Sequence, residues 1–180
     1  PSWAERARGG VTIEELQCAP NATRAAELTQ AQFPWICFTS GRRSPWNQAR
    51  VMAKNLAEDR TWMQATYAPG PPLTLLQGWL DAHADQTTAE DLSHGLYGVM
   101  LAMEPDVLRK LSRHFTGDAW DAQWPRTLGM EGSWVYNDAL GFAVRNFLLT
   151  LPVELGLEKV LTKEGTLKIL HAQFMSTVEI

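Results

Sequence analysis

Apolar residues recur at three- and four-residue steps along most of the chain, which is the spacing of one face of an α-helix. The pattern is clearest after Ser44-Pro45, a pair typical of an N-cap followed by proline at the first helical position. It predicts a helix over 45–67, whose repeating positions are Trp46, Ala49, Ala53, Leu56, Ala57, Arg60 and Met63.

The same spacing predicts further helices on both sides of this segment. Thr12 is a suitable N-cap for the first of them, and Thr87 or Thr88 for a later one. The expected ranges are 13–17, 21–32, 73–85, 88–103, 105–115 and 133–151, then a short helix up to Leu161 and a last one after Gly165 that contains Leu167, Ile169, Leu170 and Phe174.

Strand-like composition is confined to Phe33–Phe38, which contains a proline and has no evident partner strand. We therefore expect this segment to be extended and buried, and we expect 117–132 to be a loop. The predicted fold class is all-α, an irregular multi-helix bundle with at most one or two short strands. We expect the whole chain, 1–180, to form a single domain. If it has two lobes, we expect the boundary between them at the Pro-Gly-Pro-Pro run, 69–72.

Composition narrows the functional classes. The formal net charge of −4 argues against a nucleic-acid binder, because phosphate binding depends on clustered lysine and arginine. No apolar run approaches the roughly 20 residues of a membrane span, and no signal peptide opens the sequence, so we expect a cytoplasmic protein without membrane insertion. The eight tryptophans are many for 180 residues; most should fill the core, and one or two could anchor a partner.

Motifs for catalysis or cofactor binding are missing from the linear sequence. None of His83, His94, His114 and His171 is four residues from another histidine, and no serine-nucleophile or phosphate-loop pattern occurs. Cys18 and Cys37 suit two reduced, buried thiols. Asp118 and Asp121 share the expected loop and could pair. We accordingly expect a non-enzymatic chain without a metal or cofactor.

Candidate partner-contact residues fall into two groups of basic and aromatic side chains. The first stands at the start of the 45–67 helix: Arg42, Arg43, Trp46 and Arg50. The second lies in the turn-rich segment 117–134, with Trp120, Trp124, Arg126 and Glu131 as candidates and Trp134 beside them. Arginine and tryptophan are enriched at interface centres. The alternative is that the arginines are solvated and the tryptophans fill the core.

The stretch from Leu108 to Pro152 resembles one known family. The matching positions are Leu108-Arg109, His114, Trp120, Trp124, Arg126, Leu128 and Glu131, followed by an expected long apolar helix that ends at Pro152. They are similar to the SctK/YscK/OrgA family, the cytoplasmic accessory subunits of bacterial type III secretion systems. The resemblance covers about a quarter of the chain. It implies a helical, non-enzymatic adaptor of the sorting platform, with the cytoplasmic domain of the membrane-ring protein and the pod protein as partners.

Three functional hypotheses follow. The first is a helical adaptor or scaffold that acts by protein–protein contacts. The second is a viral or phage coat protein, which would form large assemblies at high concentration. The third is an enzyme whose site is assembled from residues distant in the sequence, which a pocket lined by a histidine or a carboxylate pair would favour.

Overall fold

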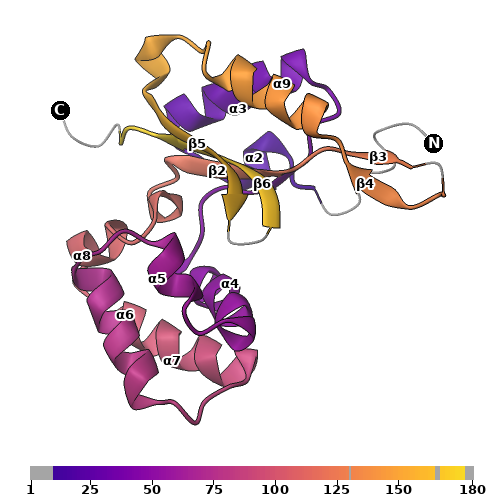
Figure 1. Ribbon diagram of the computed structural model, residues 1–180. Helices are drawn as coiled ribbons and strands as arrows, with labels where there is room; N and C mark the ends of the chain where they lie inside the picture. Colours follow the sequence, from indigo (N-terminus) through magenta and orange to yellow (C-terminus); the bar gives the residue numbers. More distant parts are fainter. Residues whose placement is uncertain (1–9, 130, 165–166, 177–180) are drawn as a thin grey trace. The chain divides into compact units, whose positions relative to one another are not determined.

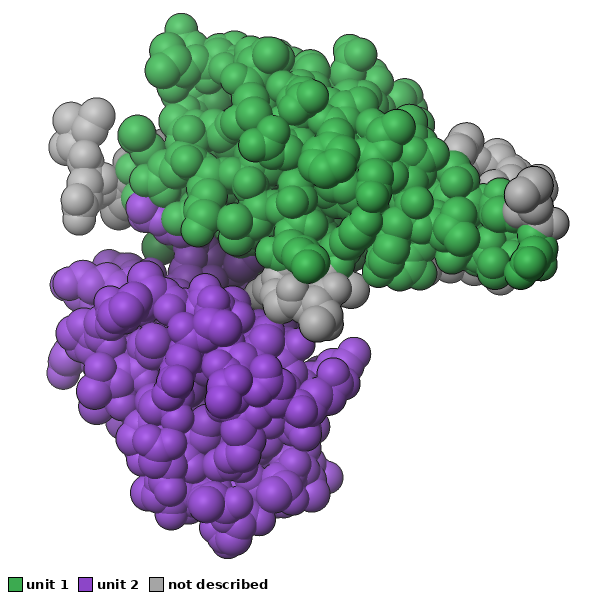
Figure 2. Space-filling view, in the orientation of Figure 1, with its two compact units in different colours: residues 1–42, 116–180 green, residues 43–115 purple. Residues whose placement is uncertain are grey.

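Two separate hydrophobic cores divide the chain into two units (Figure 2). The computed structural model describes residues 10–129, 131–164 and 167–176, so the start of the chain, where a signal peptide would stand, lies outside the described residues. Unit 1 comprises Pro1–Arg42 and Thr116–Ile180, and unit 2 comprises Arg43–Phe115. Each buried cluster draws its residues from one unit alone, so each unit has a core of its own.

The prediction of an all-α fold is wrong, because unit 1 contains a four-stranded antiparallel sheet and a separate two-stranded sheet. The strand order of the larger sheet is β1-β2-β6-β5 (Figure 1). Its strands are β1 (Phe38–Ser40), β2 (Ala119–Gln123), β6 (Leu167–Phe174) and β5 (Leu157–Glu164). The predicted last helix is β6, the predicted loop at 117–132 contains β2, and the extended segment after Phe33 leads into β1.

The wrong prediction of a helix in place of β6 arises because apolar side chains occur on both faces of this strand. In β6, Leu170, Ala172 and Phe174 face the core, while Ile169 and His171 lie on the opposite face. Because Ile169 is also buried, apolar residues occur on both faces of the strand. A short apolar run of this kind has no clean period of two, and from sequence it cannot be told from a buried helix.

Two helices cover one face of the sheet (Figure 1). They are α3 (Pro20–Gln32) and α9 (Asp138–Leu148). On α3, Ala22, Ala25 and Ala26 are fully buried, and these small side chains let the helix approach the sheet closely. The other elements of unit 1 are the short α2 (Ile13–Leu16), whose predicted Thr12 N-cap is confirmed, and the 3₁₀ turn η2 (Val153–Leu155).

The long helix predicted over 133–151 is also wrong in its first part. Trp134–Tyr136 forms β4, which pairs with β3 (Arg126–Leu128) in an antiparallel hairpin. A run of aromatic and β-branched residues favours a strand. Asn137 then starts α9, since its side chain accepts a hydrogen bond from the backbone N–H of Leu140 at 3.0 Å.

Unit 2 is helical, and here the sequence pattern predicted the elements well. Its elements are α4 (Pro45–Glu58), α5 (Trp62–Thr66), α6 (Pro71–Ala82), α7 (Ala89–Ala102), α8 (Pro105–Arg109) and η1 (Arg113–Phe115). The predicted N-caps Ser44 and Thr88 are confirmed. The helix expected over 45–67 is interrupted at Asp59, whose carboxylate accepts hydrogen bonds from the N–H and hydroxyl of Thr61. The Pro-rich run at 69–72 lies inside this unit, between α5 and α6.

In each unit, a hydrogen bond joins the two chain segments on either side of the insertion point. In unit 2, the backbone N–H of Arg43 donates to the carbonyl of His114 at 3.0 Å. In unit 1, the guanidinium of Arg42 donates to the carbonyl of Thr116 at 2.8 Å. Unit 2 is therefore inserted between β1 and β2 with its entry and exit adjacent, as is usual for an inserted domain. None of the helices in the described ranges has the length and apolar character needed to span a membrane.

We expect unit 2 to fold on its own. The separate core and the adjacent ends predict that residues 43–115, expressed alone, give a helical circular dichroism spectrum and a single cooperative unfolding transition. If the isolated 43–115 segment shows the narrow amide-proton dispersion of an unfolded chain in NMR, the division into two cores is contradicted.

Two glycines of α7 provide a matched test of the packing between α6 and α7. A Cβ added at Gly95 would lie 1.8 Å from the ring of Trp79, whereas a Cβ at Gly98 meets nothing within 4 Å. We expect Gly95→Ala to lower the free energy of unfolding by about 1–3 kcal/mol, because the indole must move. Gly98→Ala should raise it by roughly 0.5–1 kcal/mol through helix propensity. Chemical denaturation measures both, and similar effects at the two positions would contradict the packing described.

Candidate functional site

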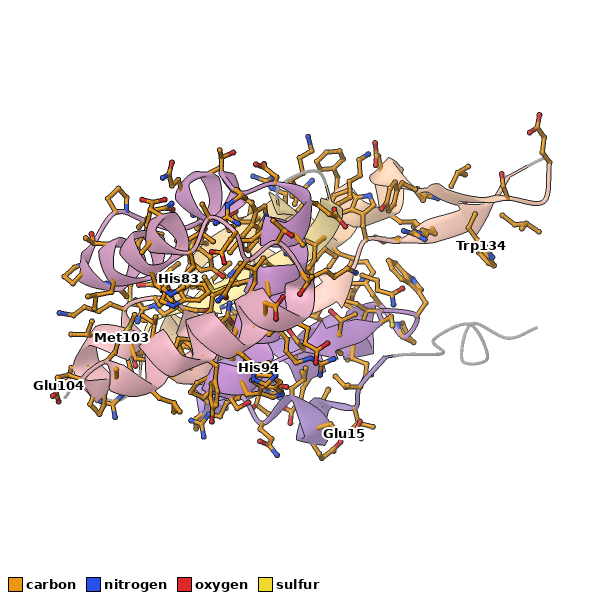
Figure 3. All side chains as sticks on the ribbon, turned by 90° about the horizontal axis from the view of Figure 1, so that it is seen from below. Glu15, His83, His94, Met103, Glu104 and Trp134 are labelled. Carbon is orange, nitrogen blue, oxygen red and sulfur yellow. The ribbon has the colours of Figure 1, made fainter. Side chains whose placement is uncertain are left out.

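The β3–β4 hairpin carries an exposed surface of aromatic, apolar and basic side chains. The register pairs Arg126 with Tyr136 and Leu128 with Trp134, while Thr127 pairs with Val135 between them. Alternation puts Arg126, Leu128, Trp134 and Tyr136 on one side of the ribbon, and we call these four residues the hairpin face. Exposed fractions are 60% for Leu128, 48% for Trp134 and 39% for Tyr136. The Trp134 side chain projects away from the hairpin (Figure 3).

A cation–π contact orders one end of this face. The guanidinium carbon of Arg126 lies 4.6 Å from the centroid of the Tyr136 ring, and Arg126 also donates to the Tyr136 hydroxyl at 3.0 Å. The ammonium of Lys168, on β6, lies 5.4 Å from the same ring. Lys168 also forms an ion pair with Asp138 at 2.6 Å. This bond holds the pKa of the Asp138 carboxyl below its usual value.

The second group of predicted contact residues is divided between core and surface. Trp120 and Trp124 are buried at 0% and 3% exposure and belong to the core of unit 1, so they present no surface to a partner. Arg126 and Glu131 are exposed. Leu128 and Tyr136 were not among the predicted contacts, because they share a face only through the pairing of β3 with β4, and no hairpin was predicted there.

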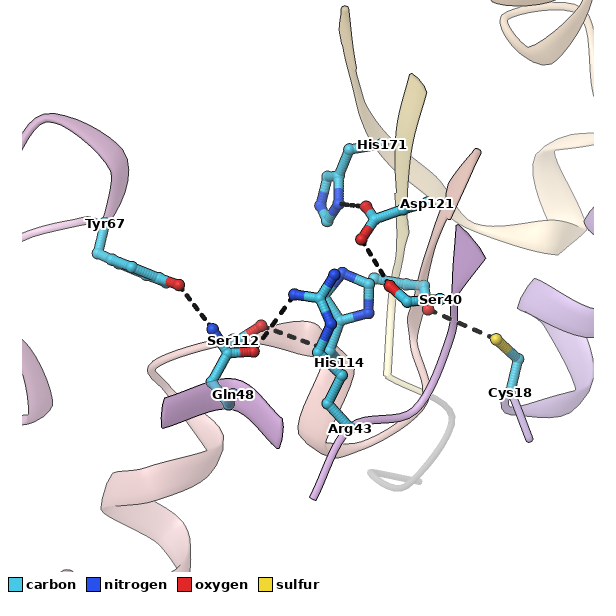
Figure 4. Close-up of polar contacts among 10 residues, drawn as sticks. Cys18, Ser40, Arg43, Gln48, Tyr67, Ser112, His114, Asp121 and His171 are labelled. Carbon is cyan, nitrogen blue, oxygen red and sulfur yellow. Dashed lines mark hydrogen bonds and ion pairs between the residues drawn. The ribbon is translucent and has the colours of Figure 1, made fainter. Parts of the chain in front are cut away.

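The first group does not form one described surface. Arg42 belongs to unit 1, while Arg43, Trp46 and Arg50 belong to unit 2. Trp46 is half-buried against the rings of His94 and Tyr97, at centroid distances of 5.0 and 5.3 Å. Arg43 donates to the side chain of Gln48, which in turn donates to the Tyr67 hydroxyl at 2.7 Å (Figure 4). These contacts explain Arg43 and Trp46 as parts of unit 2's own structure, while Arg50 is exposed.

A row of polar side chains crosses three neighbouring strands of the sheet. Asp121 of β2 is directly opposite His171 of β6, and Ser40 of β1 is opposite Asp121. The buried Asp121 carboxylate accepts from the Ser40 hydroxyl at 2.7 Å and lies 2.7 Å from Nδ1 of His171 (Figure 4). The expected pairing of Asp118 with Asp121 is not what the structure shows, since Asp118 accepts from the Thr116 hydroxyl instead.

This row differs from a Ser-His-Asp triad in the order of its members. In the triad, histidine lies between serine and carboxylate and takes the serine proton. Here the carboxylate is the middle group, so the Ser40 hydroxyl donates to Asp121, and Asp121 in turn faces Nδ1 of His171. The arrangement therefore holds the carboxylate between the hydroxyl and the imidazole.

The two cysteines are free thiols. Burial raises the pKa of Cys18 to about 12, and burial also raises the pKa of Cys37. The Cys18 thiol donates to the carbonyl of Ala119 at 3.4 Å. A thiol that stays protonated near neutral pH is a poor nucleophile.

Comparisons of the chain with protein-family models, curated proteins and solved structures find no match. What describes this protein is therefore its fold. It consists of an antiparallel sheet covered by helices, a separate exposed hairpin, and a helical unit inserted between β1 and β2.

The two buried tryptophans of unit 1 allow a matched test. Trp124 donates from Nε1 to Asp138 at 3.0 Å, whereas Nε1 of Trp120, although buried, has no hydrogen-bond partner among the described residues. An unsatisfied buried donor costs about 1–3 kcal/mol, and replacing the indole removes that cost. We therefore expect Trp120→Phe to destabilise unit 1 less than Trp124→Phe does. Urea unfolding measures both; a larger loss at Trp120 would contradict the assignment of these bonds.

Proposed function

We propose that this chain is a non-enzymatic adaptor that acts by protein–protein contact, and that the hairpin face is the surface it uses. One observation carries the proposal: a two-stranded ribbon outside the main sheet exposes Leu128, Trp134 and Tyr136 side by side. Adjacent exposed apolar side chains on a folded protein mark an interaction surface, whereas single ones do not.

The chemistry of the face suits the centre of a protein interface. Tryptophan, tyrosine and arginine are the residues that most often dominate binding energy in such interfaces. The stacking of Arg126 on Tyr136 orders both side chains before a partner arrives, which lowers the entropy lost on binding. A two-stranded hairpin is only marginally stable by itself, so a partner that covers its face also stabilises it.

The resemblance to the SctK/YscK/OrgA family names the first proteins to test as partners. These are the cytoplasmic domain of the membrane-ring protein and the pod protein of a type III secretion system, and under this proposal the chain works with them in the cytoplasm. Of the residues that carry the resemblance, Arg126 and Leu128 lie on the hairpin face.

We expect a photo-reactive amino acid at position 128 to cross-link the chain to a distinct protein in its native cells. Once that partner is purified, Trp134→Ala should weaken its binding about tenfold or more, the loss expected of an interface anchor. Val153→Ala is the matched control: Val153 is 87% exposed in the same unit, outside the hairpin, and its variant should bind normally.

Three outcomes of these experiments would count against the proposed adaptor surface. Equal cross-linking from positions 128 and 153 would count against the hairpin face as a specific surface. Cross-links only to further copies of the chain, together with large assemblies at high concentration, would favour the coat-protein hypothesis. If the Trp134→Ala variant binds the purified partner normally, the indole ring of Trp134 is not an anchor of the interface.

A further inference from the structure

The pairing of Asp121 with His171 brings two metal-ligating groups together on one face of the sheet. Directly opposed residues of antiparallel strands have Cβ atoms about 4.5–5.5 Å apart, so their side chains converge. Oδ1 of Asp121 and Nδ1 of His171 are 2.7 Å apart (Figure 4). The side chain of Asp121 is 2% exposed and that of His171 is 17% exposed, so solvent reaches the pair from the imidazole side.

This separation is close to what one ion requires of two neighbouring ligands. Zinc binds histidine nitrogen and carboxylate oxygen at about 2.0–2.2 Å in tetrahedral geometry, which puts two ligand atoms roughly 3.3 Å apart. The Oδ1–Nδ1 pair needs to open by only about 0.6 Å to meet this geometry. Imidazole with carboxylate is also a ligand set typical of zinc and neighbouring first-row metals.

We propose that Oδ1 of Asp121 and Nδ1 of His171 bind a first-row divalent metal ion, such as Zn²⁺, as a chelating pair. The ion takes the place of the proton between the two atoms. With a neutral imidazole, that proton moves from Nδ1 to Nε2, the carboxylate stays ionised, and no electron is transferred. Water or other donors occupy the remaining positions, so the site is an open one.

A hydrogen bond from Ser40 helps to hold the pair. The Ser40 hydroxyl donates to the other carboxylate oxygen, Oδ2, at 2.7 Å, and this bond keeps Oδ1 turned toward His171. Ser40 is thus a positioning residue, comparable to the outer partners that orient metal ligands. Cys18 is not one of the ligands, because its sulfur is not among the ligand atoms that lie within 4.8 Å of one another around Asp121 and His171, and its thiol donates to the backbone carbonyl of Ala119.

The wild-type chain supplies the first test, which needs no variant to fold. In ¹⁵N NMR, Co²⁺ at substoichiometric amounts should broaden the resonances around Asp121 and His171 before all others. Zn²⁺ should move the imidazole proton of His171 from Nδ1 to Nε2, a change read from the two ring nitrogen shifts. No sulfur-to-cobalt charge-transfer absorption is expected. Broadening centred on another residue, or an unchanged His171 tautomer at saturating Zn²⁺, would overturn the proposal.

Variants then show which side chains contribute to the affinity for Zn²⁺. Circular dichroism checks that each variant is folded. By calorimetry with Zn²⁺, His171→Gln should abolish the site, Asp121→Asn should weaken it at least about tenfold, and Ser40→Ala should weaken it less. His83→Gln is the control, since His83 stacks on Trp79 in unit 2 and should leave Zn²⁺ binding unchanged. Equal losses from His83→Gln and His171→Gln, or full affinity in folded Asp121→Asn, would refute the chelating pair.

Discussion

The pairing of β2 between β1 and β6 is the interaction on which the rest of unit 1 depends. It joins three segments that are far apart in the sequence, Phe38–Ser40, Ala119–Gln123 and Leu167–Phe174. Because residues 119–122 are buried on both faces of β2, this strand supplies the core with Trp120 and the opposite face with Asp121. Loss of this register would therefore remove the core packing and the polar row together, since a slip of one residue exchanges the two faces.

Local signals in the sequence were enough to predict most of unit 2. Ser44 before Pro45 and Thr88 before an amphipathic run mark helix starts by chemistry that acts within a few residues. The pairing of β2 with β1 and β6 has no such local signal, because it joins segments that are far apart in the sequence. In β6, apolar residues on both faces gave a false helical spacing. The Gly165-Thr166 pair, between two strand-like runs, was a turn signal in the sequence that would have favoured strands.

Both candidate sites depend on strand register rather than on motifs. Arg126 and Glu131 were proposed as contacts from residue type, but Tyr136 joins Arg126 only because β3 and β4 pair across the hairpin. Likewise, Asp121 and His171 are fifty residues apart and form a pair only because β2 lies beside β6. Trp120 and Trp124, two of the candidate contacts, are side chains of the core of unit 1, which is the alternative that the sequence left open.

The adjacent entry and exit of the helical unit have a consequence for how such a chain arises. Arg42 is tied to Thr116 on one side of the junction, and Arg43 is tied to His114 on the other, so each unit closes its own ends. A gene segment for the helical unit could therefore be gained, lost or exchanged in one recombination event while the sheet keeps its register. The sheet and the helical unit are thus free to diverge in sequence at different rates.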